Sequence, residues 1–201
     1  GKKFFRAVIY LPNLVSAVAL ATMWLQYVYS SKFGLLKSIL DAVGMHKLAE
    51  TAWLDTGHKF GALLFAYCFG MIGYHMLIWM SGIERISPEL YEAATIDGAN
   101  RRQTFFHIVL PLIAPTGGII AILCAINSLK VFDIVKTMTE GGPYYATDVI
   151  ATYVYRTAFS SEIGMPRLGY ASAAALFFGG AVIIIGILLN AMKDRLQKNV
   201  Q

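Results

Sequence analysis

Two carboxylate residues, Glu92 and Asp97, lie in a polar segment between two long apolar stretches of the sequence. Ala93 and Ala94 stand between them, and Gly98 follows. A carboxylate removed from water forms short, charge-assisted hydrogen bonds with arginine, and alanines let a helix enter a groove on another protein. These residue types therefore predict a docking surface. The alternative interpretation is a solvated surface helix that only closes a long loop.

The same segment carries residues that begin and end a helix. Ser87 suits the N-cap, Pro88 the first helical position and Glu89 the first turn, where the helix dipole favours negative charge. Gly98 suits the left-handed position that follows a last helical turn. We therefore predict a short helix that starts at Pro88 and ends before Gly98, and a second one that starts near Asn100.

The sequence shows no arrangement of residues typical of catalysis. It lacks the Gly-x-x-x-x-Gly-Lys-Ser/Thr phosphate-binding loop, so we do not expect this chain to bind ATP. Cys68 and Cys124 are expected to pack as reduced thiols in apolar stretches. The histidines lack the spacing of metal ligands: His46, His58, His75 and His107. We expect no enzyme activity, metal or cofactor on this chain, and either a buried hydrogen-bonding role or a place on a solute pathway for His75.

The composition predicts a membrane protein. Of the 201 residues, 57% are hydrophobic and 14% are charged, and the mean hydropathy is +0.57. Soluble domains carry about 25% charged residues. Four stretches without Asp, Glu, Lys or Arg are each long enough to cross a hydrocarbon core of roughly 30 Å as a helix: Ala7–Tyr29, Phe60–Met80, Phe105–Leu129 and Leu168–Met192. We predict an all-α polytopic transmembrane helix bundle with four spans, as a single domain over residues 1–201.

The basic residues indicate the orientation of the bundle. The net charge of +5 is spread over the ends of the apolar stretches, which is typical of anchoring at a membrane edge and not of a nucleic-acid surface. Lys and Arg are densest in the two tails and in the loop 84–104. Because positive charge concentrates in short cytoplasmic segments, we expect both termini and this loop in the cytoplasm.

Prolines predict departures from straight helices. Pro111 and Pro115 lie one turn apart near the start of the third stretch, where each removes a backbone donor. We expect a bent or broken helix there that acts as a hinge, and a kink at Pro12 in the first stretch.

Small residues at helical spacing predict close helix approach in the second and fourth stretches. The two rows are Ala62, Ala66 and Gly70, and Ala171, Ala175 and Gly179. Packing inside the bundle and a dimer interface are both open interpretations of these rows.

The loop 84–104 and the start of the third stretch resemble the EAA loop of binding-protein-dependent ABC importer permeases. The resemblance rests on the run Leu90-Tyr91-Glu92-Ala93-Ala94-Thr95-Ile96-Asp97-Gly98-Ala99, followed by Phe105, Ile108, Leu110-Pro111 and Pro115. The preceding Ser87-Pro88-Glu89 is similar to the carbohydrate-importer branch. Further similar motifs extend over nearly the whole chain: Leu11-Pro12, Phe132-Asp133, Thr139-Glu140-Gly141-Gly142-Pro143, Tyr155-Arg156-Thr157-Ala158-Phe159 and Gly169-Tyr170-Ala171-Ser172-Ala173.

The resemblance implies that residues 84–104 form a cytoplasmic coupling loop seated in a cleft of an ATPase subunit. Glu92 would form the ion pair, Ala93 and Ala94 the close-contact face, and Gly98 the turn between the two short helices. Asp97 completes this expected coupling site.

The resemblance also implies partners and a location. It predicts a second permease subunit, ATPase subunits that hold ATP and Mg, an extracytoplasmic solute-binding protein, and a place in the plasma (inner) membrane of bacteria or archaea. Such permeases usually have more spans than the four seen here, so we expect this chain to be truncated at its N-terminus.

Several polar or aromatic residues are candidates for contact with a solute. Sugars are bound through amide and hydroxyl groups and aromatic rings, and polar groups inside a membrane are costly enough to indicate function. The best candidates lie near the outer end of the third stretch, and two tyrosines in the second are weaker: Asn127, Ser128, Lys130, Asp133, Tyr67 and Tyr74. Interhelical hydrogen bonds or interface anchoring would explain each of them equally well.

Two other functions fit a helix bundle. An ion-coupled secondary transporter needs ionisable residues at mid-membrane, and the apolar stretches hold only His75 and, at an edge, His107. A non-transporting membrane scaffold or sensor would use the loop 84–104 only for docking. The leading hypothesis is a transmembrane permease subunit of an ATP-driven importer for a sugar or related polar solute.

Overall fold

The computed structural model describes residues 1–55, 57–159 and 165–198, with side chains as far as Ala191. Every regular element in these ranges is a helix, which confirms the all-α prediction. The helices fall into two compact units. One comprises residues 1–73 with 129–180, and the other residues 74–128 with the chain from 181 onward.

Within the described ranges, three helices are long and apolar enough to cross a membrane. They are α5 (Lys59–Glu84), a continuous helix over Arg101–Leu129, and α11 (Leu168–Lys198), whose apolar part is Leu168–Ala191. They correspond to the second, third and fourth predicted stretches, and the side chain of Met192 lies outside the described ones. The polytopic helix bundle is therefore confirmed for these three.

The first stretch is not one straight span, which corrects the prediction of a single helix over residues 7–29. Two helices meet here at 98°: α1 (Lys2–Leu14), and α2 (Ala17–Met23) continued by η1 (Trp24–Val28). Pro12 lies inside α1, and Val15 just beyond it is extended, with φ −79° and ψ 141°. The Ser16 hydroxyl then accepts a hydrogen bond from the Ala19 N–H at 3.2 Å and starts the next helix. The proline and the N-cap together produce a sharp bend where only a kink was expected.

The row of small residues in α5 packs against α1 and α2. Ala66 is fully buried, and a Cβ added at Gly70 would lie 2.9 Å from Cδ2 of Leu20. At Gly73 an added Cβ would lie 2.5 Å from the carbonyl oxygen of Ile9, so only glycine fits there. The row in α11 differs in exposure: Ala171 is buried, whereas Ala175 and Gly179 are exposed. For α5, packing inside the bundle is the correct interpretation.

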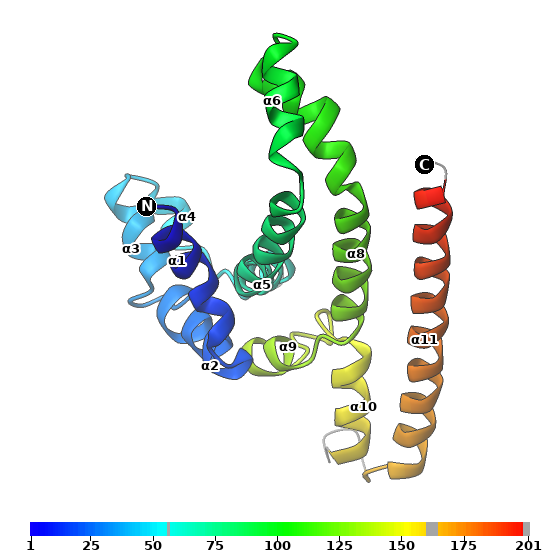
Figure 1. Ribbon diagram of the computed structural model, residues 1–201. Helices are drawn as coiled ribbons and strands as arrows, with labels where there is room; N and C mark the ends of the chain where they lie inside the picture. Colours follow the sequence, from blue (N-terminus) through cyan, green and yellow to red (C-terminus); the bar gives the residue numbers. More distant parts are fainter. Residues whose placement is uncertain (56, 160–164, 199–201) are drawn as a thin grey trace. The chain divides into compact units, whose positions relative to one another are not determined.

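The core of the first unit is built around Trp24 of η1. The centroid of its ring lies 5.3 Å from those of Tyr29 and Phe69, and the Tyr29 hydroxyl donates to the carbonyl of Ala62 at 3.1 Å. The apolar pattern does not predict three short helices of this unit: α3 (Leu35–Ala42), α4 (His46–Ala49) and α9 (Asp133–Met138). Helix α9 packs against α2 (Figure 1). It buries Val135 in this core.

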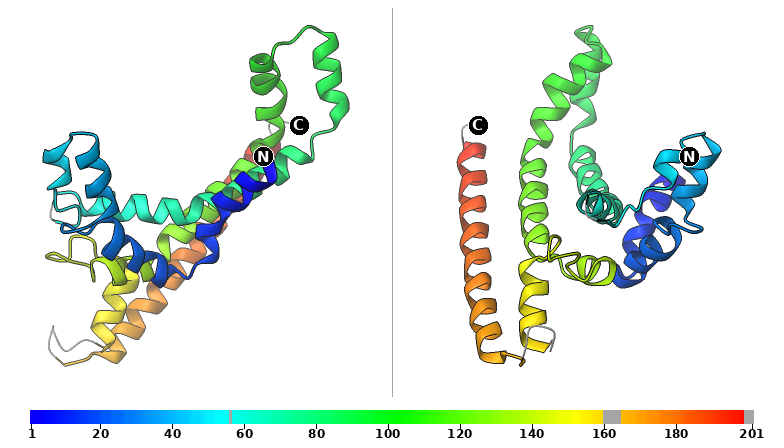
Figure 2. Two further views of the ribbon diagram at one scale, coloured as in Figure 1. Left: turned by 90° about the vertical axis from the view of Figure 1, so that its left-hand side faces the viewer. Right: turned by 180° about the vertical axis from the view of Figure 1, so that it is seen from behind.

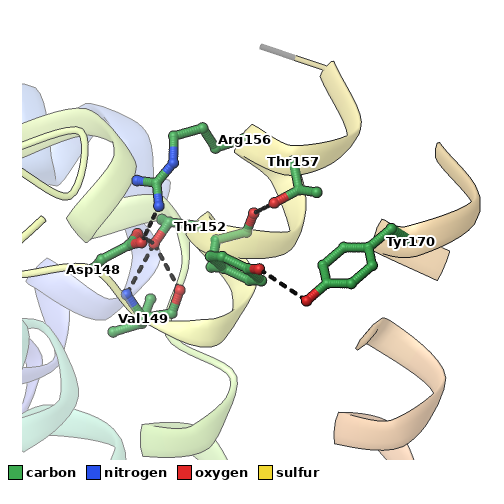
Figure 3. Close-up of polar contacts among 7 residues, drawn as sticks. Asp148, Val149, Thr152, Arg156, Thr157 and Tyr170 are labelled. Carbon is green, nitrogen blue, oxygen red and sulfur yellow. Dashed lines mark hydrogen bonds and ion pairs between the residues drawn. The ribbon is translucent and has the colours of Figure 1, made fainter. Parts of the chain in front are cut away.

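An ion pair that the sequence did not suggest fixes the start of α10 (Ile150–Phe159). Nη2 of Arg156 donates to Oδ2 of Asp148 at 2.6 Å, and only 12% and 13% of these side chains are exposed (Figure 3). The Thr152 hydroxyl donates to the other carboxylate oxygen of Asp148. On its other side, the guanidinium carbon of Arg156 lies 3.9 Å from the ring centroid of Tyr145. The segment before α10 is thereby attached to the helix.

Candidate functional site

Helix α6 (Pro88–Ile96) connects α5 to the long helix over Arg101–Leu129 and lies at the turn of the second unit (Figure 2). Its start follows the prediction: Ser87 is the N-cap residue, Pro88 occupies the first turn, and Glu89 places a carboxylate there. The Ser87 hydroxyl, however, makes no capping hydrogen bond, which corrects the expected role of that side chain.

The C-terminal end of α6 is closed as predicted by Gly98. Its φ of +73° lies in the left-handed region, and an added Cβ would meet nothing within 4 Å, so the backbone conformation alone selects glycine. The N–H of Ala99 donates to the carbonyl of Ala94 at 2.9 Å, and the N–H of Gly98 to that of Thr95 at 3.1 Å. This pair of bonds is a Schellman motif, which satisfies carbonyls at the end of the helix.

A capping box directs the chain into the long helix immediately afterwards. The long helix consists of three consecutive elements: α7 (Arg101–Thr104), η2 (Phe105–Val109) and α8 (Leu110–Leu129). The side-chain oxygen of Asn100 accepts from the N–H of Gln103 at 2.9 Å, and Oε1 of Gln103 accepts from the N–H of Asn100 at 2.9 Å. The sequence predicted a second helix here but missed the box, although Asn-x-x-Gln is a variant of its known pattern.

The two alanines of α6 do not share one contact face, which corrects the prediction. Ala94 is only 5% exposed inside this chain, whereas Ala93 is exposed. Adjacent helical residues point about 100° apart, so one neighbour packs inward while the other faces out. The outward face instead joins Glu92 and Ala93 to Ile96, which is 86% exposed. Sequence reasoning missed Ile96, although its spacing from Ala93 and Glu92 places it on their side of the helix.

A groove of about 350 Å³ lies between α6 and the start of the long helix, and one of the two carboxylates of the site lines it. Its lining is Ala94, Asp97, Gly98, Ala99, Gln103, Thr104, His107 and Ile108. Asp97 lies on this groove, whereas Glu92 lies on the outward face. Nδ1 of His107 is 3.0 Å from the carbonyl oxygen of Gln103, which holds the imidazole against the helix.

The long helix is bent at its start and is not broken by the prolines, which agrees with the first of the two predicted alternatives. The helix over Arg101–Leu129 is continuous, and Figure 1 shows its first part inclined to α8. The π turn η2 pairs the N–H of Leu110 with the carbonyl of Phe105, five residues back. Just before Pro111, this wider turn accommodates a missing donor without ending the helix, and the helix also runs on through Pro115.

The predicted solute-contact residues are divided between the two units. Tyr67, Lys130 and Asp133 belong to the first unit, and Tyr74, Asn127 and Ser128 to the second. The Ser128 hydroxyl donates to the carbonyl of Cys124 one turn back at 2.8 Å, which satisfies it within its own helix. The Tyr74 ring meets the His75 ring edge-on at 5.4 Å between centroids. Tyr67 packs against the core of the first unit, and Asn127 is half-buried.

His75 makes a polar contact but is not buried. Its Nε2 lies 3.2 Å from Sγ of Cys124, which links α5 to α8, and the side chain is half-buried. Both cysteines are free and exposed on the helices of this chain. Among the described residues, no group of three or more His, Cys, Asp or Glu residues could hold a metal ion.

The chain is similar to transport proteins over its whole length. The family model described as binding-protein-dependent transport system inner membrane component matches residues 1–201. The chain is 33% identical over 196 residues to the probable ABC transporter permease protein YurN of Bacillus subtilis, covering 97% of this chain and 64% of that relative. It is 36% identical over 196 residues to the probable starch degradation products transport system permease protein AmyD of Thermoanaerobacterium thermosulfurigenes, covering 96% and 64%.

The fold is similar to that of a solved transporter. A chain in the crystal structure of a bacterial alginate ABC transporter, in complex with alginate pentasaccharide-bound periplasmic protein, matches with a TM-score of 0.84 at 27% identity. The match covers 98% of this chain and 66% of that one. The chain thus spans just under two thirds of the length of these relatives.

Proposed function

Because this chain belongs to the family of inner membrane components of binding-protein-dependent transport systems, we propose that it is the permease subunit of an ATP-driven importer. It is a multi-pass membrane protein of a permease family. We place it in the plasma (inner) membrane of bacteria or archaea. The solute is a sugar or a related polar molecule, a choice supported by the names of relatives that transport starch degradation products and alginate.

The observation that carries this proposal is the outward face of α6. Glu92 offers an exposed carboxylate and Ala93 a small side chain, and Ile96 leaves 86% of its surface uncovered. Isolated large apolar side chains on a surface are common, but here one lies beside a carboxylate on a helix whose C-terminal end is closed by a Schellman motif. Such a face fits the cleft of an ATPase subunit, where the carboxylate pairs with an arginine and the isoleucine is buried.

The assembly that follows has four kinds of component. ATPase subunits bind α6 and hold ATP and Mg, so this chain supplies no catalytic residue. A second permease subunit completes the solute path, and an extracytoplasmic solute-binding protein delivers the solute. Closure of the ATPase subunits pushes on α6 and shifts the permease between two states, to the extent that the ATPase binds one of these states more tightly. Residues 84–104 serve as the coupling loop of one transmembrane permease domain.

The substitution Glu92→Lys tests this proposal in the native importer, reconstituted in vesicles with its ATPase and solute-binding protein. We expect loss of ATPase copurification and of solute-stimulated ATP hydrolysis, because a lysine repels the arginine that the carboxylate binds. Membrane insertion should be unchanged. Glu50→Lys, which makes the same change of charge at an exposed residue at the end of α4, should keep both activities.

The test also separates the importer from a membrane scaffold. A scaffold would retain its ATPase partner but show no solute uptake in the unsubstituted protein. Normal solute-stimulated hydrolysis by the Glu92→Lys variant would disprove the coupling role of α6. An ion-coupled transporter is set aside by membership of the family.

A further inference from the structure

Three close contacts join α5 to α8 within the second unit. A Cβ added at Gly82 would lie 2.7 Å from Oγ1 and 3.2 Å from Cβ of Thr116. A Cβ added at Gly117 would lie 2.8 Å from Cη2 of Trp79. The third contact is the 3.2 Å pair of His75 and Cys124. As residue numbers rise along α5 they fall along α8, so the two helices run antiparallel.

The spacing shows that these contacts form one continuous seam. His75, Trp79 and Gly82 are separated by four and three residues, which places them on one face of α5. On α8 the corresponding face carries Gly117 and Cys124, with two further residues buried on the same side: Ile113 at 5% and Ile120 at 7% exposure. At each glycine of the seam, a side chain of one helix rests on the backbone of the other.

We propose that residues 74–84 of α5 and residues 110–128 of α8, all in the second unit, move as one rigid hairpin with α6 at its turn, and that Trp79, Gly82, Thr116 and Gly117 are the positioning residues that hold it. This inference rests on the proposed function. Rotation or sliding of α8 against α5 would drive the Trp79 ring or the Thr116 side chain into a helix backbone. Packed interfaces of this density do not deform continuously. The push on α6 therefore moves both helices together, and α8 does not swing alone about Pro111 and Pro115.

A reversible cross-link across the seam tests the rigid hairpin. Gly82→Cys and Thr116→Cys, in a background with Cys68→Ser and Cys124→Ser, place two Cβ atoms 3.2 Å apart, a few tenths of an ångström below the roughly 3.5–4.5 Å typical of a disulfide. The complete importer in vesicles is oxidised, and cross-linking is followed through loss of free thiols. We expect the disulfide to form and ATP-driven uptake by the double-cysteine variant to be the same in its oxidised and reduced forms. The two single-cysteine variants, oxidised in the same way, report any damage caused by the oxidant.

Every outcome of this experiment decides the inference. Uptake that stops on oxidation and returns on reduction would show that α8 moves against α5 in each cycle, and would overturn the proposal. Failure of the disulfide to form would overturn the seam itself. If the unsubstituted importer shows no ATP-driven uptake, the proposed function has failed instead, before the seam is tested.

A substitution with a rescue tests the positioning role separately. Gly117→Leu forces the Trp79 ring away from α8, and we expect ATP hydrolysis that is no longer stimulated by solute, together with loss of uptake. Adding Trp79→Phe removes the Cη2 end of the ring and should restore solute stimulation. Assembly with the ATPase, measured by copurification, should be intact in both variants. Normal uptake in Gly117→Leu, or no recovery in the double variant, would contradict the role of the seam.

Discussion

The N–H of Ala99 donates a hydrogen bond of 2.9 Å to the carbonyl of Ala94 and closes the C-terminal end of α6. The same residue, Ala94, is buried against the chain that follows, next to the groove formed with α7 and η2. Ala94 thus accepts the hydrogen bond that closes the helix and also packs inside the chain, whereas the neighbouring Ala93 is exposed. The direction in which α6 presents Glu92 and Ile96 depends on this arrangement.

The first prediction concerns Gly98. Gly98→Ala should lower the free energy needed to open the C-terminal end of α6 by about 1 kcal/mol, because a residue with a Cβ is strained in the closed conformation, where φ is +73°. The amide of Ala99 should then exchange its hydrogen roughly fivefold faster, since this local opening becomes easier. Hydrogen exchange of residues 88–100 in the purified chain measures the effect. Gly61→Ala, in α5 with no atom within 4 Å of an added Cβ, is the matched control, and an equal exchange rate in both variants would contradict the strain.

The second prediction tests whether the ATPase binds the outward face of α6, which carries Ile96. Ile96→Ser should weaken binding of the ATPase about tenfold, because roughly 1.5 kcal/mol of apolar burial is lost at the interface. Titration of the reconstituted permease with ATPase subunits gives the dissociation constant. Leu48→Ser, a similar change on the exposed surface of α4, should leave the constant unchanged. Tight binding by the Ile96→Ser variant would show that α6 docks through another face.

The third prediction concerns the ion pair before α10. Arg156→Met should destabilise the chain by about 3 kcal/mol, because the nearly buried Asp148 carboxylate loses its charged partner. Asp148→Asn added to this variant should recover part of the loss, since no unpaired charge is then buried. Thermal unfolding of the detergent-purified protein measures both steps.

A surface pair provides the control for that ion pair. Lys136 and Glu140 lie 3.9 Å apart with 37% and 74% of their side chains exposed, so Lys136→Met should cost less than about 1 kcal/mol. If Arg156→Met had no greater effect than Lys136→Met, the ion pair with Asp148 would not anchor α10.

Local sequence determined the membrane class, the long helices and the limits of α6. Apolar length sets the spans, because a helix of given composition either can or cannot cross a hydrocarbon core. Pro88 and Gly98 fix the ends of α6 through their own backbone preferences, without help from distant residues. The same reasoning predicted only a kink at Pro12 and not the sharp bend that follows it, although Ser16 carried the N-cap that completes this bend.

Tertiary structure decided which residues of these helices face one another. No local preference predicts the following contacts. Ala94 is buried within the chain, and Asp148 forms an ion pair with Arg156. Gly82 of α5 packs against α8, and Gly117 of α8 packs against α5. A sequence pattern gives the face of a helix, but the partner of that face is set by how separate helices pack. The sequence by itself therefore identified a membrane protein and predicted a docking helix, whereas only the packing showed which side of that helix is exposed and that α5 and α8 are in contact.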